Sequence, residues 1–113
     1  MAAIVGAGCA PRAGWQRTDR RTCAADEAPR VCVAADPDRQ LVVRAGGETL
    51  VPGECMTGPS RRGGRLRVAV DDGRAGRTTW RWVRVGGGQV TTVGLEERRG
   101  ESRVSRARAA CER

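Results

Sequence analysis

Hydrophobic and polar residues alternate in short runs from Arg30 onward. In the clearest run, residues 65–70, Leu66, Val68 and Val70 fall on one face of a strand and two arginines fall on the other. Similar runs follow at intervals of about 8–12 residues and are separated by Gly, Pro and Asp, as in all-β domains. The pattern therefore predicts β-strands throughout this region.

Two pairs of turn residues predict tight hairpins. Gly46-Gly47 joins residues 41–44 to 49–51, and glycine tolerates the positive φ that such a turn requires. This turn sets Val43 opposite Leu50.

Arg99-Gly100 closes a second hairpin, in which Leu95 lies opposite Val104. Residues 104–111 also fit a helical face, but we favour a strand.

About seven short strands in consecutive hairpins predict a small antiparallel β-sandwich or barrel. Three regions follow from the composition. Residues 1–13 read as the remnant of an export signal or as a lipobox-like segment, and residues 14–29 as an extended arm. Residues 30–113 form a single β-domain.

The interior of this domain is thin. Leu, Ile and Val contribute 18 of 113 residues, and Phe and Tyr are absent. This share lies below the ~20% at which highly charged chains are often disordered. The cysteines offset this weakness, because disulfides stabilise small exported domains.

Five cysteines are present, and Cys9 lies apart from the other four. Cys23, Cys32, Cys55 and Cys111 are therefore predicted to form two disulfides. Several connectivities are open. We favour Cys23–Cys32, which ties the arm to the first strand, and Cys55–Cys111, which ties the central loop to the C-terminus.

The same composition argues against a metal, a cofactor or an enzyme. Histidine is absent and no Cys-x-x-Cys pair occurs, although zinc sites normally contain such close ligands. Catalytic triads also require the missing histidine. The adjacent acids Asp71-Asp72 and Glu96-Glu97 point to opposite faces of a strand and form no dyad.

The net charge of +8 comes from arginine, because all 21 basic residues are Arg. The absence of Lys, Asn, Phe and Tyr indicates the GC-rich coding sequence of a bacterium, which explains part of this excess. Nucleic-acid binding through Arg61, Arg62, Arg65 and Arg67 is thus a second alternative, and nucleic acid is not the partner we expect.

The N-terminus indicates export. Residues 1–13 are small and apolar up to Arg12, and they are too short for a transmembrane span. The sequence Gly-Ala-Gly-Cys-Ala resembles a bacterial lipobox, in which Cys9 would be lipidated. We expect a secreted protein, with a lipid-anchored protein at the cell surface as the alternative. A cytosolic protein with a free Cys9 thiol is also open.

The most unusual strand contains two tryptophans. Trp80, Trp82 and Arg84 share one face, and Val83 and Val85 share the other with Arg81. We favour both tryptophans in the core, with a bulge before Val83 that resets the alternation. The alternative is an exposed platform of Trp80, Trp82 and Arg84 that binds a partner.

Trp15 and Arg17 lie in the arm, where neighbouring residues offer little to pack on. Trp beside Arg is typical of interface hot spots, so we consider both as partner-binding residues. The alternative is that the arm folds back and Trp15 caps the sheet.

Residues 52–64 form the longest stretch without alternation. A Cys-anchored loop of this kind can inhibit a protease, with Met56 or Arg61 entering the specificity pocket. An ordinary surface loop is the favoured interpretation.

Together these features predict a small secreted, non-enzymatic protein-binding module or adaptor subunit of an extracellular complex, such as a secreted antibacterial assembly. Its partner is expected to be another secreted protein. The first alternative is an extracellular serine-protease inhibitor that uses residues 55–62.

Overall fold

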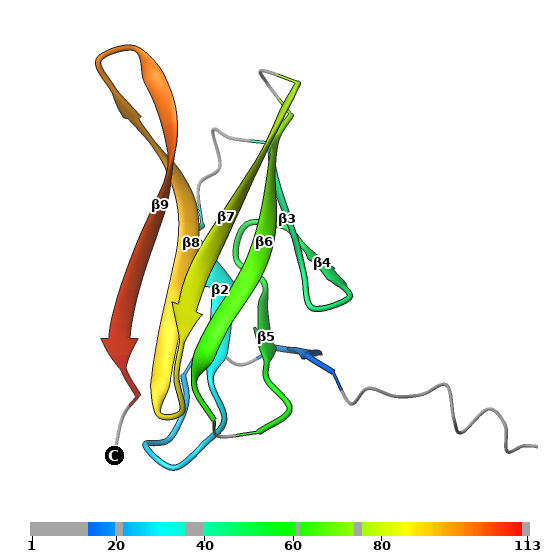
Figure 1. Ribbon diagram of the computed structural model, residues 1–113, viewed down its shortest axis with the longest axis vertical. Helices are drawn as coiled ribbons and strands as arrows, with labels where there is room; N and C mark the ends of the chain where they lie inside the picture. The colour runs from blue at the N-terminus through cyan, green and yellow to red at the C-terminus, as the bar shows by residue number, and fades with distance from the viewer. Residues whose placement is uncertain (1–13, 20–21, 36–39, 61, 74–75, 112–113) are drawn as a thin grey trace, which may run out of the picture.

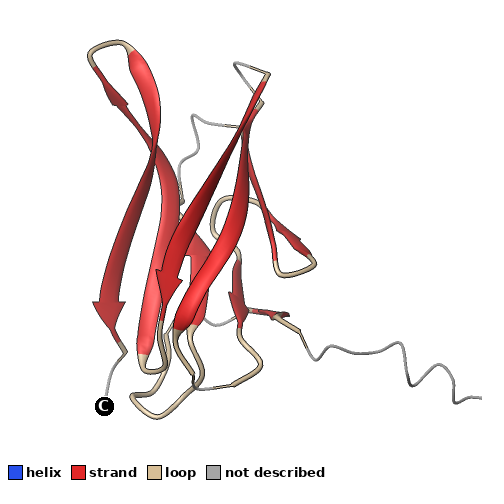
Figure 2. Ribbon diagram, viewed as in Figure 1, coloured by secondary structure: helices blue, strands red, loops and turns tan. Residues whose placement is uncertain are grey.

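The computed structural model describes residues 14–19, 22–35, 40–60, 62–73 and 76–111. These residues contain nine strands and no helix (Figures 1 and 2). The strands are β1 (Gln16–Thr18), β2 (Arg30–Val33), β3 (Leu41–Ala45), β4 (Glu48–Leu50), β5 (Cys55–Thr57), β6 (Gly64–Asp72), β7 (Arg77–Val85), β8 (Gln89–Arg98) and β9 (Glu101–Ala110). The predicted all-β class is confirmed.

The strands form two sheets that pack face to face. One sheet has the order β1-β5-β2-β8-β9, and the other has the order β4-β3-β6-β7. In Figure 1 the strands β6 and β7 lie in front of β2 and β8, with β9 at the outer side. Of the two predicted architectures, the structure has the sandwich.

Both predicted hairpins form in the expected register. Val43 pairs with Leu50 across a turn in which Gly46 and Gly47 have φ values of 59° and 83°. Leu95 pairs with Val104 in the β8–β9 hairpin. The last segment is a strand up to Ala110, as favoured over a helix.

The core lies between the two sheets and consists mainly of valine. Its buried side chains come from β2, β3, β4, β5, β6, β7 and β8. They include Leu50, Met56 and most of the strand valines, such as Val31, Val43 and Val68. Leu66, Val68 and Val70 of β6 face inward as predicted, with Leu66 at the margin.

Two short strands and one pairing differ from the prediction. β1 lies inside the predicted arm and β5 inside the predicted loop, and β5 joins β1 to β2. Three-residue strands carry too little alternation to be recognised by themselves, and neither of these two is joined to its partner by a tight turn, as β4 is to β3. In addition, β2 pairs with β8 in parallel, so the sheet is not purely antiparallel.

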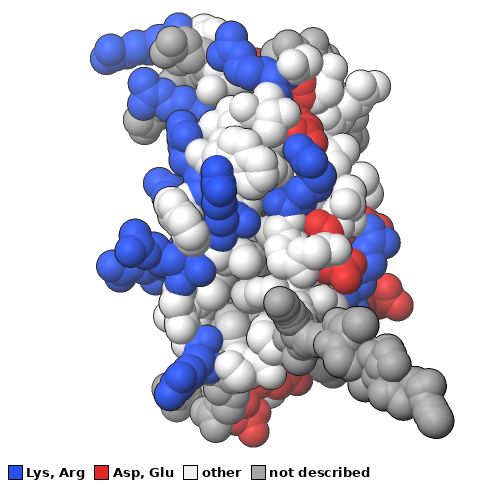
Figure 3. Space-filling view, turned by 45° about the vertical axis from the view of Figure 1, so that its right-hand side comes forward, with Lys and Arg blue, Asp and Glu red and all other residues white. Residues whose placement is uncertain are grey.

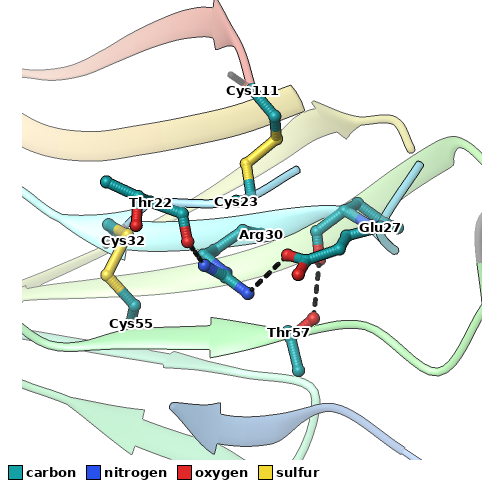
Figure 4. The surroundings of a disulfide bond; sticks show 9 residues. Thr22, Cys23, Glu27, Arg30, Cys32, Cys55, Thr57 and Cys111 are labelled. Atoms are coloured by element: carbon teal, nitrogen blue, oxygen red, sulfur yellow. Dashed lines mark hydrogen bonds and ion pairs between the residues drawn. A yellow bond between two sulfur atoms is a disulfide. The ribbon is translucent and has the colours of Figure 1, made fainter. Parts of the chain in front are cut away.

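The four predicted cysteines do form two disulfides, but the favoured connectivity was wrong. The bonds are Cys23–Cys111 and Cys32–Cys55 (Figure 4). Cys32 and Cys55 are direct cross-strand partners on β2 and β5, with their Cα atoms 4.0 Å apart. This neighbourhood follows from the pairing of β2 with β5, which the sequence did not reveal.

The Cys23–Cys111 disulfide closes the end of the sandwich at which β9 ends. The amide of Cys111 donates to the carbonyl of Gly88 (2.7 Å), and the amide of Gly88 donates to the carbonyl of Glu27 (3.0 Å). The chain end, the β7–β8 turn and the loop after Cys23 are therefore held together by hydrogen bonds as well as by sulfur.

Arg30 is buried between the two disulfides, with 2% of its surface exposed. Its guanidinium donates to Glu27 Oε2 at 3.1 Å and to the carbonyl of Thr22 (Figure 4). These contacts tie the loop after Cys23 to β2. Arg30 is structural here, because its charge is enclosed by the fold.

The N-terminal segment 1–13, with Cys9, lies outside the described residues. The export and lipidation hypotheses therefore stay predictions. Within the described ranges, no helix has the length and apolar character needed to cross a membrane.

Candidate functional site

The outer face of β6 and β7 carries both exposed tryptophans. Trp80 and Trp82 are 49% and 56% exposed, and Arg84 continues the same side of β7. The favoured assignment of these tryptophans to the core was therefore wrong. The structure has the alternative, an exposed row of Trp80, Trp82 and Arg84, which we call the Trp–Arg face together with Arg65 and Arg67.

Regular pairing explains this exposure. β6 and β7 pair without interruption from Gly64 opposite Val85 to Asp72 opposite Arg77, so the predicted bulge is absent from this hairpin. Side chains alternate between faces along a strand. Because Val83 and Val85 fill the core, Trp80, Trp82 and Arg84 must point outward.

Arginines of β6 lie over the tryptophan rings of β7. The guanidinium carbon of Arg67 is 4.3 Å from the ring centroid of Trp80, and that of Arg65 is 5.9 Å from the ring centroid of Trp82. The direct partner of Arg67 is Trp82, so both contacts are diagonal cross-strand pairs. Cation–π attraction of about 0.5–1 kcal/mol at exposed sites orders the rings on the surface.

An ion pair borders the Trp–Arg face where β6 turns into β7. Arg44 Nε lies 3.1 Å from Asp71 Oδ2, and the hydroxyl of Thr78 donates to Asp71 Oδ1. The hydrogen bond from Thr78 is the main cause that lowers the pKa of Asp71 below its ordinary value of 3.8. Desolvation by partial burial opposes this shift, and the hydrogen bond and charge of Arg44 add smaller lowering contributions.

Replacing Thr78 by Val is expected to raise the pKa of Asp71 toward 3.8, because the main hydrogen bond to the carboxylate is lost. A lowered folded-state pKa adds stability above pH 3.8 that disappears as the pH falls through the folded value. The Thr78→Val variant should therefore lose less stability than the wild type when the pH falls below about 4. Side-chain NMR titration of Asp71 measures this change, with Thr49→Val as control; an unchanged pKa in Thr78→Val contradicts it.

The predicted arm is docked on the domain. Trp15 packs against the core, and its Cδ1 lies 2.5 Å from the position that a Cβ of Gly46 would occupy. The ring also reaches Gly58, next to Pro29. The structure thus has the alternative in which the arm folds back and Trp15 caps the sheet.

Arg17 is also engaged within the protein. Its guanidinium donates to Glu54 Oε1 at 3.0 Å and to the carbonyl of Thr49, and it lies 3.5 Å from Glu48. These contacts link β1 to β4 and to the turn before β5. Trp15 and Arg17 lie apart from the Trp–Arg face, so the five predicted partner-binding residues do not form one site.

Met56 does not fit its predicted role in an inhibitory loop. It belongs to β5, its side chain is 0% exposed, and both neighbouring strands pair with it. A side chain buried in this way cannot enter the pocket of a protease. Arg61, the other candidate, lies outside the described residues.

A groove that the sequence did not reveal runs beside the Trp–Arg face, between the edge of β7 and β9. Its volume is about 510 Å³. It is lined by Arg65, Trp82, Val83, Arg84, Thr91, Arg106 and Arg108. We call it the arginine groove, because its lining residues include four arginines and no acid.

Two side chains of the groove bind backbone oxygens of β7. Thr91 Oγ1 donates to the carbonyl of Arg84 at 3.0 Å, and Arg106 Nη1 donates to the carbonyl of Trp82 at 3.1 Å. β7 is the last strand of its sheet, so these oxygens have no strand partner. The groove depends on how β7 and β9, which lie in different sheets, are placed beside each other. No sequence pattern predicts that placement.

Across the described part of the chain, no cluster of three or more Cys, Asp or Glu side chains is arranged to hold a metal ion. Comparison of the chain with protein-family models, with curated proteins and with solved structures finds no match. The geometry of the surface is therefore the basis for a functional proposal.

Proposed function

We propose that this protein is a secreted, non-enzymatic protein-binding module, and that the Trp–Arg face is its partner-binding surface. One observation carries the proposal: Trp80 and Trp82, each about half exposed, lie side by side on a regular strand with arginines over their rings. Trp and Arg are among the residue types most enriched in interface hot spots. An adaptor subunit of an extracellular assembly fits this description.

The energy available from these side chains supports a specific interface. A Trp side chain buries roughly 150–250 Å² when covered, so each half-exposed ring offers roughly 75–125 Å². At about 25 cal/mol per Å², each contributes about 2–3 kcal/mol on binding. Because the arginines already order the rings, little side-chain entropy is lost when a partner docks.

The two disulfides support the extracellular part of the proposal. Structural disulfides persist in oxidising compartments and are rare in the cytosol. The pairs Cys23–Cys111 and Cys32–Cys55 include all four cysteines of the described residues. Cleaved export and lipid anchoring through Cys9 remain the two routes that we consider for reaching this compartment.

Trp80→Ala and Trp82→Ala are each expected to weaken binding to a natural partner by at least tenfold, without unfolding the protein. The partner is first captured on the immobilised oxidised protein from culture medium of the native host. Affinities of the variants are then measured by surface plasmon resonance. Val51→Ala is the matched control, because Val51 is 44% exposed and lies outside the Trp–Arg face. Unchanged affinity in both Trp variants contradicts the proposal.

A further inference from the structure

The five-stranded sheet extends one strand beyond the four-stranded sheet at the side of β7. The first ends with β8 and β9, whereas the second ends with β7. In Figure 1 the strand β9 lies outside β7, and no strand is drawn in front of it. The inner face of β9, which carries Arg106 and Arg108, therefore faces the arginine groove instead of a neighbouring strand.

The edge of β7 presents backbone groups to this groove. The carbonyls of Trp82 and Arg84 point there, since they accept hydrogen bonds from Arg106 and Thr91. The amide and carbonyl of one residue point to the same side of a strand, so the amides of Trp82 and Arg84 face this edge as well. An open edge of this kind is a template for a further strand.

The groove is strongly basic. Among the described residues, Arg65, Arg84, Arg106 and Arg108 form no ion pair with a carboxylate. In the view of Figure 3, basic side chains occupy the full height of the left half of the molecule, whereas acidic side chains lie at the right and at the foot. The occupant that this surface favours is therefore negatively charged.

We infer that the arginine groove binds an extended acidic segment of the partner protein, which adds to the edge of β7 as a fifth strand. Alternate residues Arg106 and Arg108 project from β9 about 6.6 Å apart, which is two strand residues. Alternate carboxylates of an extended peptide have the same spacing. The groove thus selects Glu or Asp at every second position, and backbone hydrogen bonds supply the rest of the affinity.

This inference rests on the proposed function and adds the chemistry of the partner. A sulfated or phosphorylated polymer could use the arginines, but it lacks the alternating amides and carbonyls that the edge of β7 pairs with. The contacts from Arg81 to Trp80, from Arg106 to Trp82 and from Thr91 to Arg84 do not close the edge, because each carbonyl oxygen has two lone pairs and accepts a second donor.

The test uses the whole oxidised protein and a fluorescein-labelled octapeptide of alternating Glu and Thr. Fluorescence anisotropy should show saturable binding. Arg106→Gln and Arg108→Gln should each weaken it at least fivefold, whereas Arg99→Gln, at the tip of the β8–β9 hairpin, should change it less than twofold. Because Arg108 makes no hydrogen bond or ion pair within the described part of the chain, its variant separates ligand binding from folding.

Three controls decide the outcome. A peptide with its four Glu placed consecutively should bind at least fivefold more weakly, and hydrogen exchange at the Trp82 and Arg84 amides should slow only with the alternating peptide. Equal binding of both peptides, or an equal loss in Arg99→Gln, overturns the inference. Tighter binding of oligothymidylate of matched charge would assign the groove to nucleic acid instead.

The natural partner separates this inference from the proposed function. If Trp82→Ala abolishes partner binding and the double variant Arg106→Gln with Arg108→Gln does not, the acidic strand is wrong and the binding module stands. If neither Trp80→Ala nor Trp82→Ala weakens binding of the partner, the proposed function itself fails.

Discussion

Replacing both Cys23 and Cys111 by Ser is expected to lower the free energy of unfolding by about 4–5 kcal/mol. The two cysteines are 88 residues apart, and the cost of losing a cross-link rises with the logarithm of the loop that it closes. The Cys32 and Cys55 pair closes a loop of 23 residues, so its removal should cost about 3–4 kcal/mol. Small domains have only about 5–15 kcal/mol in total.

Urea unfolding of the two double-Ser variants at one temperature measures this difference. A disulfide-linked peptide map of the oxidised wild type is the control for connectivity, and it should join the peptide of Cys23 to that of Cys111. A greater loss in the Cys32 and Cys55 variant, or a map that joins Cys23 to Cys32, contradicts the prediction.

Replacing Met56 by Ala is expected to cost about 2–5 kcal/mol of stability, because the change leaves a cavity among buried side chains. Met56 is 0% exposed and lies on β5, between β1 and β2. Val51→Ala, at a 44% exposed position, should change stability by no more than about 0.5 kcal/mol. Urea unfolding at pH 7 compares the two variants.

This experiment also decides the inhibitor alternative. If Met56 entered a protease pocket, Met56→Ala would abolish inhibition of subtilisin- or trypsin-like enzymes and leave stability near that of the wild type. We expect the opposite: a large loss of stability, and no inhibition by the wild type at micromolar concentration. A fully stable Met56→Ala variant contradicts the buried position.

The predicted features that are local in sequence are the ones that the structure confirms. Gly46-Gly47 and Arg99-Gly100 fix their own hairpins, because turn chemistry sets the register of the flanking strands. β5 and the Cys32–Cys55 disulfide depend on contacts between β2 and β5, which come from opposite sides of the β3–β4 hairpin. The Cys23–Cys111 disulfide joins positions 88 residues apart. No local sequence pattern predicts contacts between segments that are so far apart in the chain.

The tryptophans illustrate the same limit. Residues 80–85 mix apolar and arginine side chains on both faces, so alternation alone could not choose the inner one. The choice follows from the register with β6, where Leu66 lies opposite Val83 and Arg67 opposite Trp82. The connection between these strands, residues 73–76, is not one of the two-residue turns that predict the register of the other hairpins. With the register known, Val83 belongs with the inward side chains and Trp82 with the arginines.

Hydroxyl-radical footprinting of the captured complex shows whether the Trp–Arg face is the partner-binding surface, because it measures the accessibility of each tryptophan by mass spectrometry. In the free protein, Trp80 and Trp82 should be oxidised much faster than the packed Trp15. Partner binding should slow oxidation of Trp80 and Trp82 at least fivefold and leave Trp15 unchanged. Equal oxidation of Trp80 and Trp82 with and without the bound partner would show that the Trp–Arg face does not bind the partner.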